Sequence, residues 1–303
     1  MLYLKFSALE IIAVLGAFLV FKKAKFPDFG ILGSYILSAF LTATIIKSNF
    51  SPLFAPIIGI ISGIFVGFLT SLLHYKIKVN ALLSGICSLF FVFSICYLLF
   101  DTGSYNLGEN ILPHNEQIVL IFCVTYILVC SAIYWLELTN WGTKLRASAL
   151  SSNSLSYLNI NKNKQTIFYL LLGNSLIGLN SSMKFLTETN IALNMTSGVL
   201  EELLIEMVLG LFVLDIFMHI IQNKFKNLSL FFLYPVRIRI LDYIIPLIGT
   251  LIFQLIYTLS FNLFDQGYHL RALIVFILVI LILVARKLNI TRYSSLEFIG
   301  VNA

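Results

Sequence analysis

The sequence predicts an all-α bundle of membrane-spanning helices. Of its 303 residues, 59% are hydrophobic and only 11% are charged, whereas a soluble domain is typically about 45–50% apolar and about 25% charged. So few charged side chains cannot cover a water-facing surface of this size, which excludes a soluble enzyme, a disordered tail and a nucleic-acid-binding protein. The apolar residues form long unbroken runs, which excludes the alternating strands of a membrane β-barrel and leaves helices.

Runs of about 17–25 mostly apolar residues are long enough to cross a bilayer as helices. The sequence contains about nine such runs, the first and last of them short, and so predicts a polytopic bundle of about 8–10 spans. No change in composition marks a domain boundary, so residues 1–303 are expected to form a single transmembrane domain. The predicted spans are Phe6–Phe21, Phe29–Ile46, Pro52–His74, Asn80–Phe100, Ile118–Leu138, Thr166–Met183, Val199–Ile221, Leu241–Phe264 and Leu270–Val284.

The distribution of basic residues predicts the orientation of the chain in the membrane. If the turn at Lys22–Lys25 is cytoplasmic, alternation of the spans leaves few of the 20 lysines and arginines outside. Because lysine and arginine are retained on the cytoplasmic side, the N-terminus is predicted outside and the C-terminus inside. The basic residues left on the outer side are Lys5, Lys47, Lys184 and Arg271.

The cysteines and histidines give no sign of a metal or disulfide site. Cys87, Cys96, Cys123 and Cys130 all lie inside apolar runs, so they are expected to be small buried hydrophobes. His74, His114 and His269 lack metal-ligand spacing with a carboxylate or a cysteine. The sequence also lacks a glycine-rich, lysine-ending phosphate loop. We therefore expect no cofactor, metal or nucleotide to be bound by this chain.

Residues 142–161 form a polar segment that the predicted orientation places in the cytoplasm between two spans. Alanines in its first part favour helix, and its serines divide it into two short amphipathic helices. A short helix that presents apolar and basic side chains together suits docking into a groove on another protein, although a solvated connecting loop fits the pattern equally well. The residues expected to make the contact are Lys144, Leu145, Arg146, Ala147, Asn153, Leu155 and Leu158.

Four stretches carry a resemblance to a known family, in the same order along the chain. They are Phe26-Pro27-Asp28 followed by Gly33-Ser34, the histidine- and asparagine-containing stretch Leu72–Gly85, the segment Gly142–Asn161, and the turn Ile191–Gly198. Together they resemble the permease subunits of bacterial ABC importers. The most similar branch is the tryptophan/tyrosine-type uptake permeases, which are related to branched-chain amino acid and ribose permeases. In that family the third stretch corresponds to the coupling helix.

The resemblance implies a type II ABC importer permease, a transport subunit rather than an enzyme, in the bacterial plasma (inner) membrane. Its implied partners are a second copy of the permease, two ATP-binding subunits, an extracytoplasmic solute-binding protein and membrane lipid, and no nucleic acid. ATP and Mg²⁺ would be bound by the ATP-binding partner, which would drive alternating access through residues 142–161. The implied cargo is a small solute, an aromatic amino acid such as tryptophan or tyrosine.

Polar side chains within spans are costly and indicate functional sites by default. Asn174, Ser181 and Ser182 are spaced seven and eight residues apart and so share one helical face. Such a face either lines a translocation pathway or holds neighbouring helices together by hydrogen bonds. Ser84 is likewise a candidate for the pathway, or with Gly85 it marks a close helix contact. The candidate pathway residues are Ser84, Asn174, Ser181, Ser182, Asn194 and Glu206.

Two other functions fit parts of the sequence. Glu206, Asp215 and His219 form a series of ionisable side chains in one predicted span, as expected of a proton-coupled secondary transporter. Uptake that needs a proton gradient and no ATPase subunit would distinguish that carrier. A non-transporting membrane scaffold is the third possibility, and it would move no solute in proteoliposomes. Neither alternative explains the segment 142–161.

Overall fold

The computed structural model describes residues 2–99, 104–106, 116–139, 142, 161–188, 190–192, 199, 202–211, 213 and 234–263. The contacts within the chain group it into two units. One unit comprises Ile12–Leu203, and the other comprises Met1–Ile11 together with Leu204–Ala303. The first unit holds most of the described helices.

Within residues 2–99, short connections join successive helices. α1 (Leu2–Phe18), whose first residues belong to the other unit, continues into the π-helical turn η1 (Leu19–Lys23). In the other unit, residues 204–211 are helical, as is α10 (Tyr234–Leu263), which contains Pro246. The remaining helices of the first unit are α2 (Gly30–Lys47), the 3-10 turn η2 (Pro52–Phe54), α3 (Ala55–Tyr75), α4 (Ala81–Leu99), α5 (Glu116–Leu138) and α8 (Lys162–Glu188).

Four predicted spans are confirmed as helices that are long and apolar enough to cross a membrane. They are α2, α3 with η2, α4 and α5, whose ends lie within about two residues of the predicted ones, the usual variation in assigning helix ends. α8 and α10 begin before the spans predicted at Thr166–Met183 and Leu241–Phe264. The span predicted at Val199–Ile221 is described in part, and that at Leu270–Val284 lies outside the described residues.

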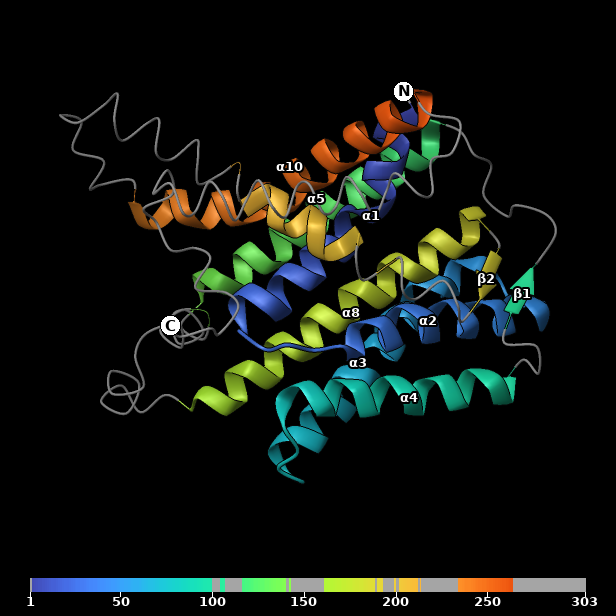
Figure 1. The fold of residues 1–303 in the computed structure, drawn as a ribbon, viewed down its shortest axis with the longest axis vertical. Helices are drawn as coiled ribbons and strands as arrows, with labels where there is room; N and C mark the ends of the chain where they lie inside the picture. The colour runs from blue at the N-terminus through green and yellow to red at the C-terminus, as the bar shows by residue number, and fades with distance from the viewer. Residues whose placement is uncertain are drawn as a thin grey trace. The chain divides into compact units, whose positions relative to one another are not determined.

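Two short strands depart from the all-α prediction. β1 (Ser104–Asn106) and β2 (Asn190–Ala192) pair antiparallel, with Tyr105 opposite Ile191. They follow α4 and α8, and their pairing brings two predicted outer loops together at one end of these helices (Figure 1). A strand of three residues is too short for its side-chain periodicity to be recognised in the sequence.

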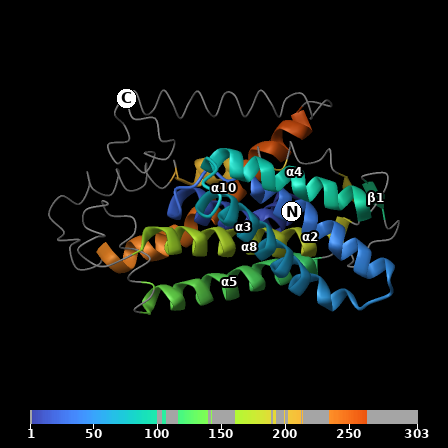
Figure 2. The ribbon, with the colours of Figure 1, turned by 90° about the horizontal axis from the view of Figure 1, so that it is seen from below.

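α2, α3, α4 and α8 lie alongside one another in the first unit (Figures 1 and 2). α3 turns its small side chains towards these neighbours and its large apolar side chains outwards, the reverse of a helix in a soluble protein. Small inward-facing residues let membrane helices approach closely. The buried residues of α3 are Ala55, Gly59, Ser62, Gly63, Val66, Gly67, Thr70 and Ser71. Its exposed large side chains are Ile57, Ile60, Ile61, Ile64, Phe65 and Phe68.

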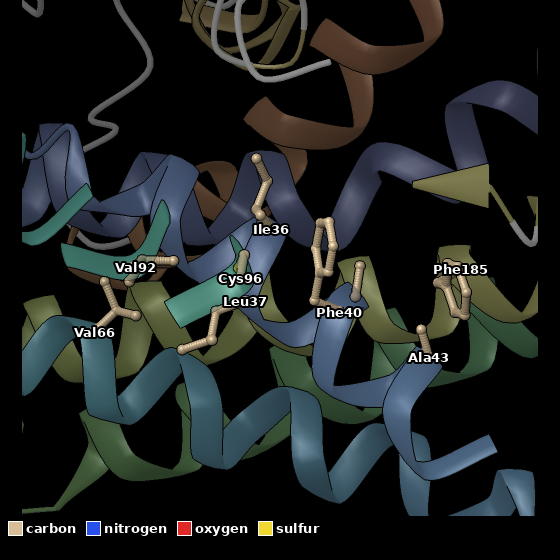
Figure 3. Close-up of a cluster of buried hydrophobic side chains, with 9 residues drawn as sticks. Ile36, Leu37, Phe40, Ala43, Val66, Val92, Cys96 and Phe185 are labelled. Atoms are coloured by element: carbon tan, nitrogen blue, oxygen red, sulfur yellow. The ribbon is translucent and has the colours of Figure 1, made fainter. Parts of the chain in front are cut away.

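An apolar cluster fills the space between these four helices towards the end of α2. Phe40 of α2 is fully buried there, together with Val66 of α3 and Val92 of α4. Phe185 of α8 closes the same cluster from the other side (Figure 3). The cluster fixes α2 among its neighbours by shape, because its members offer no hydrogen bonds.

Glycines bring the backbones of α3 and α8 into direct contact. A Cβ atom added to Gly63 would lie 2.7 Å from the carbonyl carbon of Asn174 and 2.7 Å from Cα of Ser175. One turn further along α3, a Cβ atom on Gly67 would lie 2.8 Å from the carbonyl oxygen of Leu170. Real Cβ atoms do not approach backbone this closely, so α3 and α8 can pack as they do only because these positions lack side chains.

We predict that Gly63→Ala lowers the free energy of unfolding by about 1–3 kcal/mol, because overpacking must push two backbones apart. Gly33→Ala is the matched control: its Cβ would lie 3.3 Å from a side-chain methyl of Val92, which can shift. Both changes gain the same helix propensity. Unfolding of the detergent-solubilised protein measures the difference, and equal stability of the two variants would contradict this packing.

Candidate functional site

α8 carries three of the predicted pathway residues and starts where the segment 142–161 ends. Asn161 caps its first turn, since its Oδ1 accepts hydrogen bonds from the backbone N–H groups of Asn163 at 3.0 Å and Lys164 at 3.3 Å. An N-terminal asparagine cap satisfies donors that the first helical turn leaves unpaired. The last residue of that segment is therefore tied to the first turn of α8.

Asn174, Ser181 and Ser182 are all buried within the first unit. Ser34 Oγ of α2 donates to Asn174 Oδ1 at 2.5 Å, and Ser181 Oγ donates to the carbonyl oxygen of Tyr35 at 2.5 Å. Ser182 Oγ donates to the carbonyl oxygen of Leu179 in its own helix. Two of the three predicted residues thus join α8 to α2 by hydrogen bonds, and their role in a pathway stays a prediction.

Asp28 is a buried carboxylate that we did not select from the sequence, although it lies in one of the family-like stretches. It sits in the connection between η1 and α2 and is fully buried. Its Oδ2 accepts from Asn174 Nδ2 at 3.0 Å, and its Oδ1 accepts from the backbone N–H of Gly30 at 2.7 Å. Thr70 of α3 donates a further hydrogen bond. The carboxylate therefore ties the start of α2 to α3 and α8.

Neutral hydrogen-bond donors and the N-terminus of α2 stabilise the ionised carboxylate of Asp28. Burial raises the pKa of this carboxyl to about 6, against the hydrogen bonds from Asn174, Gly30 and Thr70, which lower it. The N-terminus of α2 carries a partial positive charge that further favours the ionised form. Among the described residues, no lysine, arginine or histidine forms an ion pair with Asp28.

The predicted close contact at Ser84 and Gly85 involves this same connection. A Cβ atom on Gly85 would lie 2.6 Å from the backbone nitrogen of Phe29 and 2.8 Å from Asp28 Oδ1. Ser84 is fully buried and donates to the carbonyl oxygen of Ala81. One turn on, Ser88 Oγ lies 2.8 Å from Thr70 Oγ1. α4 thus closes the Asp28 cluster, which comprises Asp28, Gly30, Ser34, Thr70, Gly85, Ser88 and Asn174.

Glu206 belongs to the other unit, where it faces α10. It is fully buried, and its Oε1 accepts a hydrogen bond from Gln254 Nε2 at 3.1 Å. A Cβ atom on Gly249 would collide with the carbonyl oxygen of Glu206, and one on Gly210 would collide with that of Ile245. The helix formed by residues 204–211, which contains Glu206 and Gly210, therefore packs backbone to backbone on α10. Asp215 and His219, the other members of the proton-carrier hypothesis, lie outside the described residues.

The predicted contact residues of the segment 142–161 also lie outside the described residues, as does Asn194. The first residue of the segment, Gly142, is described, and its backbone N–H donates to Thr139 Oγ1 at 3.2 Å. Beside it, Lys23 of η1 and Glu137 of α5 form an ion pair at 3.9 Å.

Within the described part of the chain, no three histidine, cysteine, aspartate or glutamate side chains come together as a metal site would require.

We predict that Asn174→Leu lowers the free energy of unfolding by about 2–3 kcal/mol, because it leaves a buried carboxylate oxygen and the Ser34 hydroxyl without their partner. Ser175→Ala on the neighbouring position is the control, since Ser175 Oγ donates only within its own helix, to the carbonyl oxygen of Leu172. Thermal unfolding in detergent measures both. A loss no larger than that of the control would contradict the importance of the Asp28 cluster.

Comparison with known proteins identifies the family to which this chain belongs. Residues 2–284 match the family described as branched-chain amino acid transport system / permease component. Over 174 residues the chain is 27% identical to a tyrosine transport system permease protein of Clostridioides difficile (strain R20291), a match that covers 57% of this chain and 59% of that relative. No solved structure matches. The chain belongs to the family of branched-chain amino acid transport permease components, and so is a multi-pass membrane transport protein.

Proposed function

We propose that this chain is the membrane-spanning subunit of an ATP-driven ABC importer for an amino acid, with tyrosine or a close aromatic analogue as its cargo. Family membership supports the transport role. The name of the Clostridioides difficile relative supports the cargo, although the match covers only 59% of that protein. Since the family serves ABC transport systems, it favours the importer over the proton-coupled carrier and over the scaffold.

The main structural support for the proposal is that α8 connects the segment 142–161 to the Asp28 cluster. This helix begins at the end of the segment 142–161, where Asn161 caps it, and reaches the Asp28 cluster through Asn174. A displacement of the segment by a partner protein would be passed along a rigid helix to α2 and α3. ATP binding to that partner then biases the permease between two arrangements, provided that the partner binds them with different affinity.

The proposed assembly follows the predicted orientation. Two copies of the permease pair in the bacterial inner membrane, with the N-terminus outside and the C-terminus inside. Two ATP-binding subunits, which hold ATP and Mg²⁺, contact the segment 142–161, where Lys144 and Arg146 meet acidic groups and Leu158 enters an apolar groove. A solute-binding protein delivers the amino acid from outside. This chain itself holds no nucleotide.

We predict that the wild-type complex in proteoliposomes takes up tyrosine only with ATP, and that Arg146→Glu combined with Leu158→Asp abolishes the coupling. The charge reversal repels an acidic rim, and the buried carboxylate removes the apolar anchor. Uptake and substrate-stimulated ATP hydrolysis are measured together. Lys78→Glu, an exposed reversal in another predicted cytoplasmic turn, is the control and should retain both activities.

Three outcomes would count against the proposal. Full substrate-stimulated hydrolysis by an intact double-mutant complex would contradict the coupling role of the segment. Uptake that follows a proton gradient without the ATPase subunits would favour the carrier. Failure of the wild-type complex to move any solute would favour the scaffold.

A further inference from the structure

Asn180 of α8 is buried in an unusual state. Its side chain is fully inaccessible to solvent, yet neither Nδ2 nor Oδ1 has a hydrogen-bond partner among the described residues. A buried amide normally finds partners, because leaving its donor and acceptor unpaired forfeits the hydration that both had in water. The group therefore needs an explanation beyond packing.

The other polar side chains on α8 show that this state is not a general property of the helix. Asn174 lies six residues earlier, and its Nδ2 donates two hydrogen bonds, one to Asp28 Oδ2 and one to the carbonyl oxygen of Leu170. Its Oδ1 accepts from Ser34. The hydroxyls of Ser181 and Ser182 are also satisfied. One helix thus carries two buried asparagines, one fully paired and one unpaired.

Asn180 lies on the face of α8 that packs against α1. It is seven residues from Gly173, two helical turns away on the same face, and Gly173 meets α1 so closely that a Cβ atom on Gly16 would lie 2.6 Å from its carbonyl oxygen. Ile177, between them, also touches Gly16. Ile12, Ala13 and Leu15 of α1 are fully buried and apolar. The part of α1 that lies near this face of α8 thus offers buried aliphatic side chains.

We propose that Asn180 is a contact for the transported solute, and that its amide binds the carboxylate and ammonium groups of a free amino acid when the seam between α1 and α8 opens. This inference rests on the proposed function. Nδ2 would donate to the carboxylate, and Oδ1 would accept from the ammonium group. An uncharged amide suits this step, because it satisfies both ends of a zwitterion without holding either as strongly as an ion pair would.

The position of Asn180 along α8 agrees with such a role. It lies eight residues before Glu188, where α8 ends, so it is about 12 Å from that end of the helix at 1.5 Å per residue. In the proposed orientation this is the outer end, from which the binding protein delivers its cargo. A solute that enters from outside would reach Asn180 before the Asp28 cluster.

The test compares Asn180→Leu with Asn174→Leu in the complete complex with its ATPase subunits and its tyrosine-loaded binding protein. Leucine has the same branching at Cγ as asparagine, although its two methyl groups are larger, and it needs no hydrogen bonds. We expect Asn180→Leu to keep or raise the thermal midpoint of the complex, by up to about 4 °C, and to reduce tyrosine uptake about tenfold. Asn174→Leu should instead lower the midpoint. Asn180→Ser, which keeps a donor and an acceptor, should restore part of the uptake.

Three results would overturn the proposed role of Asn180, and they differ in what they imply for the proposed function. Wild-type uptake by Asn180→Leu would overturn the inference while leaving the proposed function intact. A fall in the midpoint of Asn180→Leu as large as that of Asn174→Leu would show a structural role and also overturn it. If the wild-type complex takes up no tyrosine, both the proposed cargo and this inference fail.

Discussion

The buried carboxylate of Asp28 is the interaction on which the arrangement of the first unit depends. It has no basic partner among the described residues, so its charge must be matched by neutral donors that are held in place. Those donors come from α2, α3 and α8, and Gly85 lets α4 approach the same point. Since each donor belongs to a different element, moving α2, α3 or α8 alone would cost this carboxylate one of its hydrogen bonds.

The distribution of side-chain size makes this cluster possible. α3 and α4 turn glycine and serine inwards and phenylalanine, leucine and isoleucine outwards, so the backbones approach closely enough for short polar side chains to reach one another. Large outward side chains are compatible with lipid, where apolar contacts cost nothing. α8 is at the centre of this packing, which explains why a helix that follows the proposed coupling segment reaches both the paired Asn174 and the unpaired Asn180.

Different parts of the structure were predictable from the sequence to different degrees. Long apolar runs located α2, α3, α4 and α5 closely, because spanning helices are defined by their length and composition. The spacing of Asn174, Ser181 and Ser182 predicted one polar face on α8. The partner of Asn174 was not predictable, since Asp28 lies 146 residues away. Strands β1 and β2 were too short to show periodicity. The role of the segment 142–161 still rests on resemblance.

The most direct test is a double-mutant cycle between Asp28 and Asn174, with Asp28→Leu, Asn174→Leu and the combined variant compared by their free energies of unfolding. If the hydrogen bond between them holds α2 to α8, the two changes will be non-additive by about 1–3 kcal/mol, because either one alone already removes the interaction. Additivity to within about 0.5 kcal/mol would show that the two side chains act independently and would contradict the central role given to this cluster.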